Sequence, residues 1–142
     1  MTETEIASEL KKKFPGLSRM LKAKDQHSRY DYENKEYIFE FKSRKKHYNP
    51  WIIEKEKLDS NLDIADDMNK DFIYVTEYKD TLYVWNISKL IRDGYDFNFE
   101  ERIAPNYTDL EDREYQYMKI KTVGYLYEIF CSTIIYRGNL FE

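Results

Sequence analysis

Three ionisable residues, Asp31, Glu40 and Lys42, have the types and the spacing to act together in chemistry. They lie in two runs of aromatic and β-branched residues, which are typical of β-strands, and the Asn-Lys pair at positions 34–35 suits a tight turn between the runs. In a hairpin centred on that turn, Asp31 pairs with Ile38. Because side chains alternate along a strand, Asp31 then shares one face with Glu40 and Lys42. The sequence therefore predicts that two carboxylates and an amine converge on one face of a hairpin.

Two neighbouring carboxylates repel each other unless a cation is bound between them or one of them is protonated. Magnesium prefers hard oxygen ligands and typically takes one or two carboxylates together with water and phosphate. Asp31 and Glu40 are therefore the predicted Mg²⁺ ligands, with Mn²⁺ as a substitute, and the main-chain carbonyl of Phe41 is a further predicted ligand. A metal ion held in this way can activate water for phosphodiester hydrolysis. Lys42 beside it would orient or help deprotonate the attacking water and stabilise developing negative charge.

The segment that contains these residues resembles a known family. An Asp on one strand of a hairpin, followed by an apolar strand that ends in Glu-x-Lys, is similar to the signature of the PD-(D/E)XK, or restriction-endonuclease-like, nuclease superfamily. Here the signature reads Asp31, Glu40 and Lys42, with Tyr30 where the family usually has proline. The likeness covers roughly residues 28–90 and looks like the layout of small phage and bacterial members. It implies a restriction-endonuclease-like fold and a magnesium-dependent deoxyribonuclease whose product carries a 5′ phosphate, and it allows structure selectivity like that of a junction resolvase.

Basic residues that could contact DNA are concentrated in the first part of the chain. Residues 1–57 contain 14 Lys and Arg against 10 Asp and Glu, whereas residues 58–142 contain 9 against 17. A polyanion needs a basic surface where it binds, and a basic average is not required. The predicted DNA contacts flank the catalytic strand and begin the next helix: Arg44, Lys45, Lys46, His47 and Lys57. By the same resemblance, Glu9 on the first helix and Glu54 are predicted accessory residues of the site.

Around the hairpin, the hydrophobic pattern predicts helices and strands in alternation. The predicted helices cover residues 2–14, capped by Thr2 or Thr4, and residues 17–24, 51–70 and 88–92. The predicted strands cover residues 28–33, 36–44, 71–78, 81–87 and 125–137. This order indicates an α/β (mixed α+β) fold with a central mixed β-sheet flanked by helices. With no internal repeat or Pro/Gly-rich linker, residues 1–142 are expected to form a single domain.

Composition limits the other classes of protein. One cysteine cannot build an intrachain disulfide framework, which indicates a reducing environment. No apolar run approaches the roughly 20 residues of a membrane span, and the charged N-terminal segment is unlike a signal peptide. We therefore expect a cytoplasmic protein, in the host cytoplasm if the source is viral, that binds no membrane. Because many members of the superfamily cut both strands as dimers, the resemblance also allows a homodimer.

Three alternatives to a nuclease stay open at this point. Charged residues alternate with apolar ones on any half-exposed strand, so the motif could belong to a solvated hairpin. A catalytically inactive protein of the same fold could bind a protein partner through the acidic half of the chain. An unrelated α+β nucleic-acid-binding module would instead gather basic and aromatic residues on one sheet face, with no metal pocket.

Overall fold

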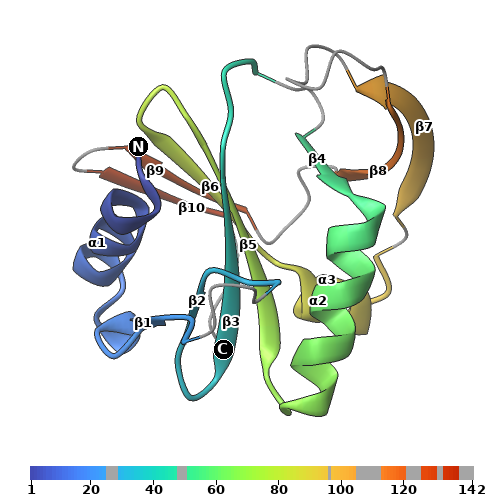
Figure 1. Ribbon diagram of the computed structural model, residues 1–142. Coiled ribbons are helices and arrows are strands. Elements are labelled where there is room, and N and C mark those ends of the chain that lie inside the picture. The colour runs from blue at the N-terminus through green and yellow to red at the C-terminus, as the bar shows by residue number, and fades with distance from the viewer. Residues whose placement is uncertain are drawn as a thin grey trace.

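A computed structural model describes residues 1–24, 29–47, 51–95, 97–104, 113–120, 126–130 and 133–137, and from residue 98 on it describes the strands alone. Within these residues the chain is mixed α/β, with two sheets and helices beside them (Figure 1). The helical elements are α1 (Glu3–Lys13), the short 3-10 helix η1 (Pro15–Leu17), α2 (Lys55–Asp67) and α3 (Ile87–Arg92). None of the described helices is both long and apolar enough to cross a membrane.

The larger sheet has seven described strands in the order β1-β2-β3-β5-β6-β9-β10. Their bounds are β1 (Leu21–Lys22), β2 (Tyr32–Glu33), β3 (Tyr37–Ser43), β5 (Asp71–Tyr78), β6 (Thr81–Asn86), β9 (Leu126–Phe130) and β10 (Thr133–Arg137). Only β3 and β5 run parallel among these pairs; every other described pair is antiparallel. The smaller sheet has the order β4 (Trp51–Glu54), β8 (Arg113–Ile120) and β7 (Asn98–Ala104). The predicted mixed central sheet is therefore confirmed.

Both faces of the larger sheet are covered, which explains why five consecutive residues at the start of β3 are buried. Alternate residues of β3 belong to two separate hydrophobic clusters. One face carries Phe39 and Phe41 and packs against Ile6 and Leu10 of α1. The other face carries Ile38 and packs with residues of α2 and α3: Leu58, Ala65, Ile87 and Leu90. The chain passes from β3 through β4 and α2 before β5, which is the crossover that a parallel pair requires.

Local signals set the ends of several elements as predicted. The Thr2 hydroxyl accepts the Glu5 N–H and the Glu5 carboxylate accepts the Thr2 N–H, both at 3.2 Å, so a capping box starts α1. Lys79 and Asp80 both have positive φ angles, as a tight turn that matches the twist of a hairpin requires, and they join β5 to β6. Gly94, with φ of +86°, follows α3.

Three predicted elements differ from those in the structure, and in each case the cause is strand pairing. Residues 17–24 were expected to be helical, but Leu21 and Lys22 pair with β2 as β1. Residues 51–54 begin the predicted long helix, yet they form β4 and pair with β8, so α2 starts only at Lys55. The single late strand expected over residues 125–137 contains two strands, β9 and β10, that pair with each other.

Candidate active site

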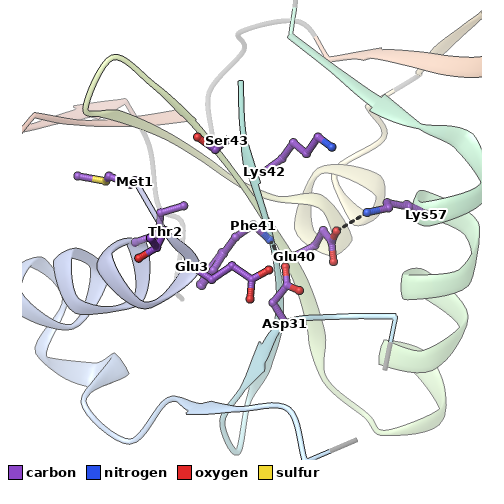
Figure 2. Close-up of a pocket in the computed structure, with 10 residues that line it drawn as sticks. Met1, Thr2, Glu3, Asp31, Glu40, Phe41, Lys42, Ser43 and Lys57 are labelled. Carbon is purple, nitrogen blue, oxygen red and sulfur yellow. Dashed lines mark hydrogen bonds and ion pairs between the residues drawn. The ribbon is translucent and has the colours of Figure 1, made fainter. Parts of the chain in front are cut away.

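A pocket of about 420 Å³ lies beside β3, at the start of β2. It is lined by side chains from four parts of the fold, as Figure 2 shows. Acidic and basic groups dominate its wall: Glu3 from α1, Asp31 just before β2, Glu40 and Lys42 from β3, and Lys57 from α2. The backbone of Phe41 lies between the two β3 residues. The structure thus places the predicted residues Asp31, Glu40, Phe41, Lys42 and Lys57 around one pocket.

Asp31 reaches the site along the edge of the sheet. The strand β2 pairs with β3 only through Tyr32 and Glu33, opposite Phe39 and Ile38. Beyond that point Phe41 meets no described strand on this side, and its N–H donates to Asp31 Oδ2 at 2.8 Å. The Asp31 N–H donates to the Phe39 carbonyl at 2.7 Å, one residue out of step with the Tyr32–Phe39 pair, which is the offset of a β-bulge. The Asp31 carboxylate therefore supplies the hydrogen-bond acceptor that a neighbouring strand would otherwise provide for Phe41.

This geometry corrects the predicted hairpin. The turn was expected at residues 34–35, which would pair Asp31 with Ile38, but the Asn34 N–H donates to the Tyr37 carbonyl. The Asn34 side-chain oxygen also accepts the N–H groups of Glu36 and Tyr37, at 2.9 and 2.7 Å. These bonds lengthen the turn and shift the register by two residues. A shift of two residues leaves side chains on the same face, so what changes is the β3 partner of Asp31. Its carboxylate bonds the β3 edge at Phe41 and lines the pocket together with Glu40 and Lys42.

Glu40 is a buried carboxyl with one cationic partner. Its side chain is 5% exposed, and Lys57 Nζ donates to Glu40 Oε1 at 2.8 Å. Burial and then the charge of Asp31 raise the pKa of Glu40 to about 7, because together they outweigh the attraction of Lys57. For Lys57, burial opposes the charged form, but the Glu40 carboxylate prevails and raises the pKa of the amine. At neutral pH the lysine is therefore charged, whereas the carboxyl is close to its half-protonated point.

Glu3 also lines the pocket, and the sequence analysis missed it. Glu3 is exposed as a residue, but partial desolvation of its carboxyl, followed by the charge of Asp31 and a hydrogen bond with it, raises the pKa of Glu3, so the two carboxyl groups are direct neighbours. The residue lies on the helix stripe that also carries the buried Ile6 and Leu10, three and seven positions later. That spacing was the signal available in the sequence. Glu9, the predicted accessory acid of this helix, lies outside the pocket lining and is 3.5 Å from Lys12.

The two lysines of the pocket differ in their surroundings. Lys57, predicted as a DNA contact, is hydrogen-bonded to Glu40. Lys42 lines the same pocket, but its side chain extends away from Asp31 and Glu40 in Figure 2. The amine beside the carboxylates in this structure is therefore supplied by α2, although the Glu-x-Lys motif predicted that it would come from β3.

The prediction that Arg44 lies on the DNA-contacting surface is wrong for this structure. Its side chain is 8% exposed and its Nη2 atom donates to the Ile52 carbonyl at 3.2 Å and to the Tyr74 hydroxyl at 3.1 Å. The guanidinium group is also 3.9 Å from Glu54, the second predicted accessory acid, which does not line the pocket. A buried guanidinium needs such partners, so Arg44 ties the end of β3 to β4 and β5.

The remaining predicted DNA contacts follow β3 on the surface. Lys45 and Lys46 are exposed. His47 is also exposed, and its ring packs beside Trp51 and Tyr78, with centroids 4.8 and 5.4 Å away. Whether these three residues touch DNA stays a prediction.

The donor set of the pocket fits one hard divalent cation. Within the described residues, no three His, Cys, Asp or Glu side chains form a group that could hold a metal ion by themselves. Magnesium, however, often uses one or two carboxylates and completes its shell with water and phosphate. Asp31 accepts the Phe41 N–H through one oxygen and Glu40 accepts the Lys57 amine through one oxygen, and each carboxyl has a second oxygen. The raised pKa values of Glu3 and Glu40 reflect desolvation first and repulsion from Asp31 second, and a bound cation would relieve the repulsion.

Comparison with known proteins does not assign the chain to a family. No family model matches it, and no curated protein and no solved structure matches it either. The chemistry of the pocket is therefore argued from its own residues.

Proposed function

We propose that the protein is a magnesium-dependent deoxyribonuclease, an endonuclease with a restriction-endonuclease-like fold. The observation that carries the proposal is the pocket in which the Asp31 and Glu40 carboxyls meet beside Lys57, with Lys42 on the same lining. Clustered acids whose pKa values are raised by burial and by one another are a common mark of functional sites. A mixed sheet with helices on both faces is compatible with the fold that the Asp31, Glu40 and Lys42 motif implies.

In this proposal the acidic residues hold the cation and the lysines handle negative charge. Asp31 and Glu40 bind Mg²⁺, with the Phe41 carbonyl as a further ligand and Glu3 as a neighbouring acid that holds water. A bound Mg²⁺ supplies positive charge against the phosphate and lowers the pKa of bound water. Lys42 orients the attacking water or takes up its proton, which is its role in the motif. Lys57 offsets the charge of Glu40 and stabilises the charge that develops on the phosphate.

The test is cleavage of a supercoiled plasmid and of a branched DNA junction in Mg²⁺ or Mn²⁺. Glu40→Ala and Lys42→Ala are expected to abolish cutting. Lys35→Ala and Glu36→Ala are matched controls, because they remove the same charges from exposed positions in the turn before β3. Cutting that persists in both pocket variants, or that falls equally in the controls, would contradict the proposed site.

One observation favours the alternative of an inactive nuclease-fold protein that binds a protein partner. Lys57 pairs with Glu40, so the buried acid has a protein partner that does not depend on catalysis. The acidic balance of residues 58–142 would suit a basic partner surface. A folded parent protein that neither cuts DNA nor binds Mg²⁺ or Mn²⁺ in calorimetry would support this alternative.

A further inference from the structure

The segment that leads into β1 is unusually basic. Residues 10–24 contain six Lys and Arg and no Asp or Glu. Arg19, Lys22 and Lys24 are exposed, and within the part of the chain that the structure describes none of the three has an ion-pair partner. Like charges on one short segment repel one another, and this repulsion is relieved when anions bind.

The fold attaches this basic segment to the outer edge of the sheet. Met20 is fully buried in the hydrophobic cluster that includes Ile6 and Leu10 of α1, and this packing anchors the segment to the core. Leu21 and Lys22 pair with Glu33 and Tyr32 of β2, and the Ala23 N–H donates to the Asp31 carbonyl at 2.9 Å. The segment is thus bonded directly to the residue that carries one of the pocket carboxylates.

The basic edge also borders the acidic wall of the pocket. Lys22 is near enough to Glu3 that its charge opposes the rise in the pKa of that carboxyl. An acid-lined pocket repels a phosphate backbone, so a polyanion can reach it only where neighbouring cations offset that repulsion. Lys22, beside Glu3, supplies a positive charge that offsets this repulsion.

We propose that Arg19, Lys22 and Lys24 form a binding surface for the phosphate backbone of DNA next to the pocket. This inference rests on the proposed function in taking DNA as the polyanion. Leu21, which is 66% exposed between these cations, then packs against the sugar of the bound strand. A membrane partner is less suited to this edge, because an interfacial helix or patch needs a broad apolar face, and here one leucine is available.

The experiment measures binding of a short fluorescent DNA duplex in EDTA, so that no cleavage occurs. The variant is Arg19→Gln/Lys22→Gln/Lys24→Gln. The control is Lys35→Gln/Lys55→Gln/Lys89→Gln, which makes the same charge change at three lysines outside the pocket lining. Circular dichroism and Tm confirm that both variants are folded.

Removing one cation that binds a phosphate lowers the slope of log K against log salt by about 0.9. The triple variant is therefore expected to lose up to about 2.7 from this slope and to bind at least about tenfold more weakly near 0.1 M salt, while the control binds like the parent. Equal binding by variant and control would overturn the proposal. So would a parent that binds anionic lipid vesicles through these residues but does not bind DNA.

The binding result is separate from the cleavage result. If the parent cuts DNA but the triple variant binds normally, the basic edge is not the DNA surface and the nuclease proposal stands. If the triple variant loses binding but the parent never cuts, the basic edge is a DNA surface and the nuclease proposal fails.

Discussion

The residue that most affects the chemistry of the pocket is Glu40. It is a carboxyl with little access to water, held between the negative charge of Asp31 and the positive charge of Lys57. Since burial and Asp31 together prevail, the charged form of Glu40 costs stability in the folded protein. A side chain that destabilises the protein without its ligand is typical of a binding site, where part of the stability is given up for function.

Replacing Glu40 by glutamine tests this cost. The pKa of Glu40 is about 7 in the folded protein, above its ordinary value of 4.5, so between these pH values the folded state binds more protons than the unfolded state. Stability therefore falls as the pH rises through this window, and the loss is complete above about pH 7. Glu40→Gln is expected to be more stable than the parent at about pH 8, by on the order of 2 to 3 kcal/mol, and equally stable near pH 4. Urea unfolding across the pH range measures the difference, and a difference that does not change with pH would contradict this account.

Lys57 is expected to compete with a metal ion for Glu40. Two unit charges 4 Å apart attract by about 4 kcal/mol at an effective dielectric constant near 20, so displacing the amine opposes cation binding. Lys57→Met is therefore expected to bind Mn²⁺ at least about tenfold more tightly, which corresponds to about 1.4 kcal/mol. Titration calorimetry makes the measurement. Lys55→Met is the matched control, because Lys55 pairs with Asp59 on the same helix and lies outside the pocket lining.

At the scale of elements, the chain predicted what depends on local signals. The Thr2 cap, the Lys79-Asp80 turn and the Asp31, Glu40 and Lys42 motif were all readable from neighbouring residues. The exact register between β2 and β3 was not readable in this way, because it depends on the backbone N–H groups that donate to the Asn34 side-chain oxygen. An Asn-Lys pair alone does not reveal whether that side chain will accept one, two or no backbone N–H groups.

The segments that were predicted to be helical but form strands show a second limit of prediction from sequence. Residues 51–54 continue an apolar pattern that suits a helix, yet they pair with β8 more than 60 residues later in the chain. The β-branched Ile52 and Ile53 beside Trp51 were the local hint of a strand. Short strands such as β1 and β4 depend on a partner that periodicity cannot show, so tertiary pairing overrides the local preference.

Helix α1 offers a test at this scale, because its first turn carries Glu3. Thr2→Ala removes the hydroxyl that caps this turn and is expected to lower the free energy of unfolding by about 1 kcal/mol. Thr2→Ser keeps the cap and is expected to lose much less. Thermal unfolding of the two variants decides between them: equal loss in both would show that the capping bond does not stabilise α1.

At the scale of the whole molecule, the pocket is assembled at the junction of two hydrophobic clusters. Glu3 comes from a helix on one face of the sheet, and Lys57 comes from a helix on the other (Figure 2). The sequence predicted the acids of the hairpin and Lys57 of the next helix, but it did not predict that Glu3 would join them. That information exists only once α1 and α2 have packed on opposite faces of β3.

A cation that binds this junction is expected to stabilise the entire fold. A ligand at 100 times its dissociation constant adds about 2.7 kcal/mol to the free energy of unfolding, which for a chain of this length corresponds to a Tm rise of several degrees. Mg²⁺ or Mn²⁺ is expected to raise the Tm of the parent in this way and to leave that of Glu40→Gln nearly unchanged. Differential scanning fluorimetry with and without EDTA makes the comparison. An equal rise in both proteins would place the cation elsewhere.

The incomplete pairing of β3 has a consequence for the state of the protein in solution. A strand edge with unpaired backbone groups can recruit a strand from another molecule and begin aggregation, unless charged side chains stand along it. Asp31, whose carboxylate accepts the Phe41 N–H, blocks this edge. Asp31→Val is therefore expected to self-associate at concentrations where Asp31→Asn stays monomeric, and light scattering can compare the two. The carboxylate that we assign to metal binding would then also keep separate copies of the chain apart.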